Sequence, residues 1–417
     1  MVATTAIDIV RTADGVPLRY KLRRVERTQR LRAMGLVAPL FLFIVVTFIL
    51  PISFLLFRSV SDPEVATHLP RTILALRSWT TADLPGEAVY AAFAADLKET
   101  QKNKTTGIVA KRINFEVAGA LSRFKAAGRA AEGMRTGPFK EGFVKLDPMW
   151  ADPMLWKIVQ RAGEPYTDYY YFAALDRKRD FEGRIGWVGE KQAVYVDVFW
   201  RTFGIASIVT LATFLLGFPV AYLLATLPVR HSNLLMILVL LPFWTSLLVR
   251  TTAWYVLLLD NGVVNDTLRF LGLIDEPLKL IFSRFSTIVA MTHIQLPFTL
   301  LPIYSVMKTI SPSHVRAARS LGAGPFYAFW RVYFPQTIPG IAAGCLLTFI
   351  LSLGYYITPA LVGGPADQMT SYYVAYFINS IINWGQASAL GAILLVATGV
   401  LYFAYNRLIG VENMKLG

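Results

Sequence analysis

The sequence predicts an all-α integral membrane protein with six transmembrane helices and a large, mainly helical extracytoplasmic insertion between the first and second. Of 417 residues, 55% are hydrophobic and only 16% are charged, a composition typical of a chain embedded largely in lipid. Apolar stretches long enough to cross roughly 30 Å of hydrocarbon occur about six times. A polar segment with helical periodicity separates the first two of them.

The expected spans differ in how purely apolar they are. The third, fourth and fifth contain internal Pro, Arg, Gln or Tyr residues, which suits helices that face protein or water rather than lipid. The six stretches run from Gly35 to Phe57, Phe203 to Leu227, Leu234 to Leu259, Ser286 to Met307, Ile338 to Ala360 and Ser388 to Phe403.

Basic residues set the expected orientation. The arm of residues 1–34 carries eight basic and three acidic residues, so the positive-inside rule places it in the cytoplasm. The helix of residues 35–57 begins too late and runs too long for a cleavable signal peptide. Six spans then put residues 228–233, 312–335 and the tail 407–417 on the cytoplasmic side as well. The loop 361–384, which lacks Lys and Arg, falls outside.

The same topology makes residues 58–198 an extracytoplasmic insertion domain. Its middle alternates apolar and charged residues at helical spacing, as at Val89, Phe93 and Leu97, so two or more amphipathic helices are expected. The stretch from Met149 to Tyr171 adds several Trp and Tyr residues. These side chains would form a small packed core, or would meet a partner protein.

A short polar segment between the fourth and fifth spans has the pattern of a helix-turn-helix. It reads HVRAARSLGAGPFYAFWRVYFP from His314 to Pro335. Ala317, Ala318 and Leu321 share one helix face and could seat in an apolar groove. Gly322 suits a left-handed residue that ends the first helix, and Pro325 suits the first turn of the second. The alternative is a basic loop that only follows the positive-inside rule.

This segment resembles the EAA motif of permease subunits of binding-protein-dependent ABC importers. The resemblance implies the type I importer permease fold over residues 199–406, with coupling helices at 312–335 that dock on an ATPase. Arg316 stands where the family usually has Glu, so an ion pair made by that Glu is not expected here. The residues assigned to ATPase coupling are Arg316, Ala317, Ala318, Gly322, Ala323, Phe334 and Pro335.

A second signature resembles the spermidine and putrescine branch of these permeases. It covers Leu241 to Asn265, with Pro-Phe-Trp, Arg-Thr, Ala-Trp and Asn-Gly-x-x-Asn in succession, and the turn around Pro219 also fits. The arm and the insertion have no counterpart in compact members. Because of the signature from Leu241 to Asn265, a polyamine is the expected substrate. An opine, an amino-acid derivative and an aminophosphonate are alternatives within the same class of importer.

A path for an organic cation is expected along the third span. Arg250 lies in the membrane, where an unpaired charge costs at least roughly 2.5 kcal/mol, so it should face a cavity or pair with Asp260. The aromatic rings would offer weak cation–π contacts, although interfacial belts and packing also collect such rings. The candidate pathway residues are Trp244, Arg250, Trp254, Tyr255, Asp260, Tyr304, Tyr355 and Tyr356.

Other function classes are disfavoured by what the sequence contains. The net charge of +14 collects at membrane-flanking positions, which suits lipid headgroups rather than nucleic acid. The chain has no Walker A loop, its four histidines lack metal-ligand spacing, and Cys345 is its single cysteine, so neither catalysis, a metal site nor an internal disulfide is expected. A gradient-driven secondary transporter is the competing class, but the spans hold almost no carboxylates.

The resemblance also implies the partners and the location. It implies a second permease subunit, related in a heterodimer or identical in a homodimer, two ATPase subunits that bind ATP and Mg²⁺, and an extracytoplasmic solute-binding protein. No cofactor is expected on this chain. The expected location is the bacterial inner membrane, with both termini in the cytoplasm.

Overall fold

The computed structural model describes residues 18–80, 83–190 and 192–409 and is built almost entirely of helices. The chain divides into two compact units, residues 1–57 and 58–417. The beginning of the predicted basic arm, including Arg11, and the tail beyond residue 409 lie outside the described residues.

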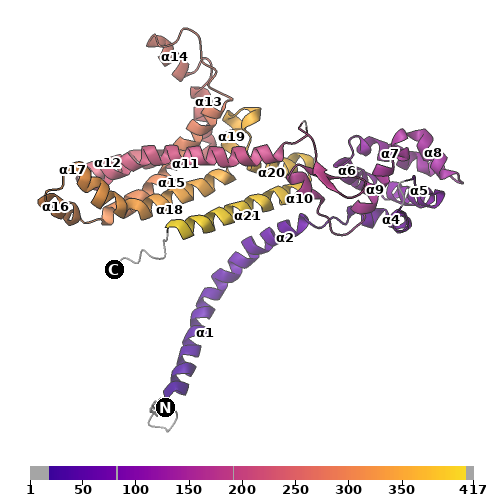
Figure 1. Cartoon of the computed structure of the whole chain (residues 1–417), viewed down its shortest axis with the longest axis horizontal. Helices are drawn as coiled ribbons and strands as arrows, with labels where there is room; N and C mark the ends of the chain where they lie inside the picture. The colour runs from indigo at the N-terminus through magenta and orange to yellow at the C-terminus, as the bar shows by residue number, and fades with distance from the viewer. Residues whose placement is uncertain (1–17, 81–82, 191, 410–417) are drawn as a thin grey trace. The chain divides into compact units, whose positions relative to one another are not determined.

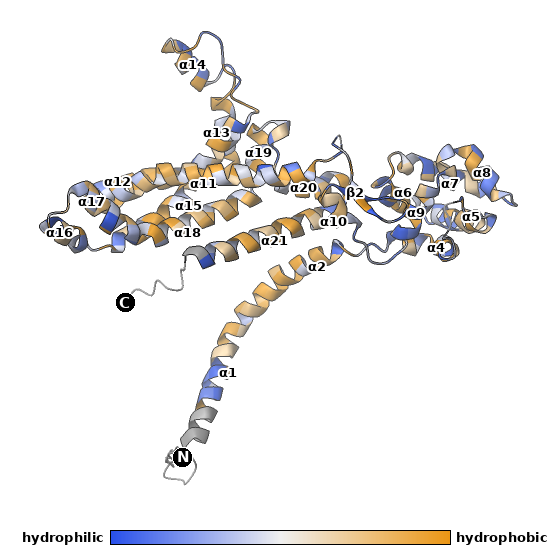
Figure 2. Cartoon of the chain, viewed as in Figure 1, coloured by the Kyte–Doolittle hydropathy of each residue, from blue (hydrophilic) through white to orange (hydrophobic). Residues whose placement is uncertain are grey.

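The described residues of the first unit form one long helix, which ends at Arg58. It consists of α1 (Leu18–Ile44), a π-helical turn (Val45–Ile49) and α2 (Leu50–Arg58). From Val25 to Arg58 it is long and apolar enough to cross a membrane, and none of its most apolar window is buried within the chain. Its hydrophobic colour in Figure 2 therefore marks a surface that lipid or another protein must cover.

The insertion domain follows as a bundle of short helices and one small hairpin. The two strands pair antiparallel, with Arg177 opposite Trp187. The elements are α3 (Glu64–His68), α4 (Pro70–Leu76), α5 (Glu87–Lys102), α6 (Thr106–Asn114), α7 (Ala120–Gly133), α8 (Phe139–Leu146), a 3-10 turn (Pro148–Ala151), α9 (Pro153–Ala162), α10 (Tyr169–Ala174), β1 (Arg177–Arg179) and β2 (Ile185–Trp187).

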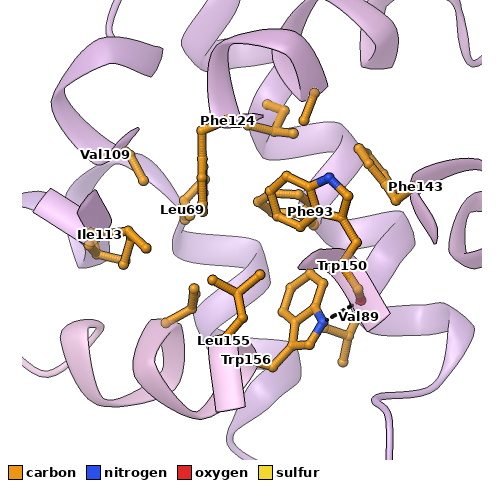
Figure 3. Close-up of a cluster of buried hydrophobic side chains, with 14 of the residues drawn as sticks. Leu69, Val89, Phe93, Val109, Ile113, Phe124, Phe143, Trp150, Leu155 and Trp156 are labelled. Carbon is orange, nitrogen blue, oxygen red and sulfur yellow. Dashed lines mark hydrogen bonds between the residues drawn. The ribbon is translucent and has the colours of Figure 1, made fainter. Parts of the chain in front are cut away.

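An aromatic core holds this domain together, as expected from the sequence (Figure 3). Phe93 is fully buried, and its ring centroid lies 5.8 Å from that of Phe124, 5.1 Å from that of Trp150 and 5.2 Å from that of Trp156. Burial of rings this large contributes most of the stabilisation of such a small core. The helical spacing that the sequence shows at Val89, Phe93 and Leu97 is thus the buried face of α5.

Three helices form the centre of the membrane-spanning part: α11 (Tyr195–Thr226), α15 (Arg284–Thr309) and α18 (Phe334–Gly354). Small residues let their backbones approach closely, as expected for helices packed in lipid. A Cβ atom placed on Gly344 would lie 2.5 Å from the carbonyl oxygen of Thr299. The Thr299 hydroxyl is 2.8 Å from that of Thr213 and 2.5 Å from that of Thr348, so it joins all three helices.

Further elements complete this part of the chain. They are α12 (Val229–Leu240), a 3-10 turn (Leu241–Trp244), α13 (Leu247–Leu257), α14 (Val263–Phe270), α16 (Pro312–Ser320), α17 (Pro325–Ala328), a π-helical turn (Phe329–Tyr333), α19 (Ile357–Val362), a 3-10 turn (Pro365–Asp367), α20 (Thr370–Tyr376), a π-helical turn (Phe377–Ile381) and α21 (Trp384–Ile409).

The described residues contain five helices able to span a membrane, or up to six if a bent pair counts as one span. The expected third span from Leu234 to Leu259 is that bent pair, and the prediction of one continuous helix was wrong. The chain bends by 95° between Trp244 and Leu247. Pro242 lies in the preceding 3-10 turn, and the extended residue Ser246 begins α13 by accepting a hydrogen bond from the amide of Val249.

The fifth span also ends earlier than expected. The sequence predicted helix to Ala360, but α18 ends at Gly354 and Tyr355 is extended. The remaining apolar residues form the separate helix α19, which packs against α13 and α15. An apolar run alone cannot distinguish one long span from a span followed by a short packed helix.

Candidate functional site

The segment between α15 and α18 folds as the expected hairpin, here called the coupling hairpin (residues 312–335). Ser311 begins α16 by accepting a hydrogen bond from the amide of Ser313, 3.3 Å away, and Pro312 occupies the first turn. Both residues suit these positions, because a Ser oxygen replaces a missing backbone acceptor and Pro needs no donor there.

Gly322 makes the turn of the hairpin. Its φ of +92° is left-handed, a conformation that is costly for residues with a Cβ. The Gly322 amide donates to Arg319 O at 3.0 Å, and the Ala323 amide donates to Ala318 O at 3.1 Å. These two bonds satisfy carbonyls at the end of α16. The conformation predicted for Gly322 from its position is confirmed.

Three of the aromatic residues after Pro325, namely Phe329, Tyr333 and Phe334, pack inward. Phe329 lies 5.7 Å from Tyr222 of α11, and Phe334 lies 5.7 Å from Phe218 of the same helix, measured between ring centroids. Tyr333 is buried among them and contacts Tyr222 at 5.5 Å. This aromatic cluster fixes the second arm of the hairpin against α11.

The outer side of the hairpin is both apolar and basic. Its apolar part, here called the hairpin patch, is exposed in this chain: Leu321 by 90%, Phe326 by 77%, Tyr327 by 59% and Trp330 by 47%. Arg316, Arg319 and Arg331 are also exposed along the hairpin. An exposed group of large apolar side chains at a tight turn is typical of a protein-binding surface.

The predicted coupling residues separate into two groups. Arg316, Ala317, Gly322 and Pro335 are exposed, whereas Ala318, Ala323 and Phe334 are half-buried. Phe334 therefore belongs to the packing of the hairpin against α11 as well as to the motif. Tyr327 of the patch was not singled out from the sequence, because the phase of the four-residue helix α17 cannot be read from periodicity over so few residues.

One of the predicted pathway residues, Trp254 of α13, contacts the central helix α15. The Trp254 Nε1 donates a hydrogen bond to His293 Nδ1 of α15 at 3.1 Å. His293 was not assigned to the pathway from the sequence, since a lone histidine in a span gives no spacing signal.

The expected pairing of Arg250 with Asp260 is not formed. Among the described residues no ion pair joins the two, and the buried Nε of Arg250 has no hydrogen-bond partner. Asp260 is exposed beyond the end of α13. The α13 helix stops at Leu257, between the two residues, so Asp260 does not continue the helix that carries Arg250.

The remaining predicted pathway aromatics lie in separate places. Trp244 is 88% exposed at the bend, and Tyr255 packs on Phe282, with ring centroids 5.8 Å apart. Tyr304 belongs to the apolar cluster beside the coupling hairpin, and Tyr355 belongs to a cluster with Met291 of α15. Tyr356 is 41% exposed after α18. They do not line a single corridor within this chain.

Residues 196–410 match the family described as "Binding-protein-dependent transport system inner membrane component". The chain belongs to this family. It is therefore a multi-pass inner-membrane permease of an ABC importer, a transport subunit rather than an enzyme, with the type I permease fold. The coupling hairpin and the three central helices lie within the matched residues.

Individual relatives are similar over the same part of the permease. This chain is 33% identical over 223 residues to the spermidine/putrescine transport system permease protein PotB of Escherichia coli K12. The match covers 54% of this chain and 81% of PotB. It is 35% identical over 219 residues to the inner membrane ABC transporter permease protein YdcU of the same organism, covering 49% of this chain and 66% of YdcU.

This chain is also similar to solved structures. Among them is that of a bacterial alginate ABC transporter in complex with an alginate pentasaccharide-bound periplasmic protein, at a TM-score of 0.45 and 18% identity, covering 54% of this chain and 80% of the matched chain.

Proposed function

We propose that this permease imports a small organic cation, spermidine or putrescine, and that the coupling hairpin transmits the action of a partner ATPase to the membrane helices. The observation that supports the substrate is the 33% identity to PotB over 81% of that protein. The exposed hairpin patch supports the coupling role, since its large apolar side chains need a partner.

The hairpin is built to transmit movement to the helices that it joins. It continues α15 at one end and α18 at the other, and its aromatic cluster packs on α11. A displacement of α16 therefore acts on all three central helices. Two packings of these helices, with populations shifted by nucleotide on the ATPase, would expose the substrate path first to one side and then to the other.

The acidic residues near the opposite ends of the spans favour a cation. Asp260, Asp275 and Glu276 are exposed there. Asp367 is less available, because it pairs with Arg284 at 3.0 Å. A cation would be attracted to the exposed carboxylates before it meets the aromatic rings near the bend.

The proposed assembly contains a second permease related to this chain, two ATPase subunits and an extracytoplasmic solute-binding protein. ATP and Mg²⁺ bind the ATPase subunits, and both termini of this chain and its coupling hairpin lie in the cytoplasm. The insertion domain lies on the extracytoplasmic side, where it helps to receive the binding protein.

Uptake into proteoliposomes tests this proposal. The vesicles hold this chain with its co-purifying partners, and labelled spermidine or putrescine is added with binding protein outside and ATP inside. We expect uptake that requires both ATP and binding protein. ATPase activity stimulated by the binding protein without polyamine uptake would reject the substrate, and an opine, an amino-acid derivative and an aminophosphonate would then be tested. Uptake independent of ATP would reject the coupling role.

A further inference from the structure

A cavity of about 730 Å³ lies where the insertion domain meets the ends of α11 and α21. Residues of the insertion form one wall and residues of the membrane-spanning part form the other. The residues that matter for its chemistry are Arg161, Tyr169 and Arg179 of the insertion, and Tyr195, Asn383 and Gln386 of the membrane-spanning part.

Two donors at this cavity are buried without an acceptor. Gln386 is only 3% exposed, and its Nε2 has no hydrogen-bond partner within the described part of the chain. The Nε of Arg179 is likewise buried and unpaired there, although its terminal nitrogen pairs with Asp168. A buried donor without an acceptor costs free energy, so such groups commonly mark a missing ligand or water.

The guanidinium of Arg161, at the same cavity, forms no ion pair among the described residues. Arg161 is half-buried and donates to the carbonyl oxygen of Asp180 at 3.2 Å. No acidic oxygen of the described residues lies within 4.0 Å of it. Burial lowers the pKa of Arg161, as does the neighbouring charge of Arg179, whereas Glu116, Asp168 and Asp180 act in the opposite direction. A bound anion would further stabilise the charged form of Arg161.

The carboxylates around the cavity are largely engaged elsewhere. Glu116 and Asp62 bind Arg112. Asp176 accepts the amides of Val194, Tyr195 and Val196 and so caps the start of α11. Asp168 pairs with Arg179, and Glu164 is exposed. The lining has five basic residues (Arg112, Arg161, Arg177, Lys178 and Arg179) against four acidic ones (Glu116, Glu164, Asp168 and Asp176).

We infer that this cavity binds a small acidic molecule whose carboxylate or phosphate group meets Arg161, Arg179 and Gln386. Guanidinium groups suit such oxyanions because they donate two parallel hydrogen bonds. The aromatic residues Phe115, Tyr169, Phe172, Tyr195 and Phe377 also line the cavity and would cover an apolar part of the ligand. The ligand would join the insertion domain to the first turn of α21.

This site is separate from the proposed transport path, and its ligand differs in charge from a polyamine. The inference therefore does not depend on the polyamine proposal. Failure of either leaves the other standing, because one is tested by uptake and the other by binding to the purified protein.

Calorimetric titration of the full-length permease in detergent tests the inference. The probes are benzoate, inorganic phosphate and benzylamine, the last matching benzoate in shape but not in charge. We expect saturable binding of benzoate or phosphate and none of benzylamine. Arg161→Gln and Gln386→Leu should each weaken the binding by roughly tenfold, as expected for loss of one hydrogen bond to a charged group.

The matched control is Arg129→Gln, which removes an exposed guanidinium of α7 outside the cavity. It should bind the anion as the wild-type protein does. Gln386→Leu carries no change of charge, so it separates a loss of the site from a general loss of positive charge. Absence of saturable binding of both anions, equal binding of benzylamine, or unchanged binding in both cavity variants would overturn the inference.

Discussion

The Nδ1 atom of His314 lies 2.9 Å from Oε1 of Gln336, which ties the start of α16 to the first turn of α18. The side-chain Nε2 of Gln336 also donates a hydrogen bond to the backbone oxygen of Val332 at 2.6 Å. The helices α16 and α18 are thus joined by these side chains as well as through the turn at Gly322. In the proposed importer, this bridge would let α16 and the start of α18 move together.

Removal of this bridge should loosen coupling without preventing insertion into the membrane. We expect Gln336→Ala to lower polyamine uptake more than it lowers ATP hydrolysis, because movement of α16 would no longer be passed fully to α18. The measurement is the number of polyamines imported per ATP hydrolysed in proteoliposomes. Gln101→Ala, a change of the same kind on α5 of the insertion domain, serves as the control and should leave this ratio unchanged.

Substitution of Gly322 should disturb the hairpin turn. Its left-handed φ would cost a residue with a Cβ roughly 1–2 kcal/mol, and Pro cannot adopt it at all. We expect Gly322→Pro to abolish uptake while the protein still inserts into the membrane. Gly324→Ser is the control, since Gly324 begins α17 with φ of −64° and open space around it. Equal loss of uptake in both variants would contradict this role of Gly322.

A charge placed on the outer side of the coupling hairpin should uncouple ATP hydrolysis from transport. Leu321 is 90% exposed, so Leu321→Asp should leave the stability of the isolated permease unchanged but weaken ATPase docking. Ala318→Glu should also reduce uptake. Leu74→Asp, at a 67% exposed position of α4, provides the control. Normal uptake by both hairpin variants would argue against the patch as the docking surface.

The contact between Gly344 and Thr299 should be intolerant of added volume. A methyl group on residue 344 would meet the Thr299 carbonyl, and forced overpacking costs about 1–3 kcal/mol. We expect Gly344→Ala to lower the thermal unfolding midpoint in detergent. Gly391→Ala makes the same change on α21 where no atom lies within 4 Å of the added carbon, and it should leave the midpoint unchanged.

Some features could be predicted because local physical rules determine them. Gly322 follows a helix end and has the left-handed conformation expected there, and Phe93 occupies the buried phase of an amphipathic helix. Long apolar runs likewise indicated where most spans lie. These signals depend on neighbouring residues only, so one sequence is sufficient to find them.

Other features depend on tertiary structure and could not be predicted. The apolar run around Pro242 gave no sign of a 95° bend. The missing ion pair between Arg250 and Asp260 reflects the end of α13 at Leu257, between the two residues. The cavity at Arg161 and Gln386 joins residues more than two hundred positions apart. Such a site appears only when packing brings the two elements together.

Crosslinking from residue 321 to the ATPase tests the central role of the hairpin most directly. Cys345 is the single cysteine, so Leu321→Cys in a Cys345→Ser background can carry one maleimide–benzophenone label, with Leu74→Cys as the matched exposed control. In inside-out vesicles holding the whole complex, we expect light to join the label at position 321, but not the label at position 74, to the ATPase subunit. No crosslink from position 321, or an equal yield from both positions, would contradict the account.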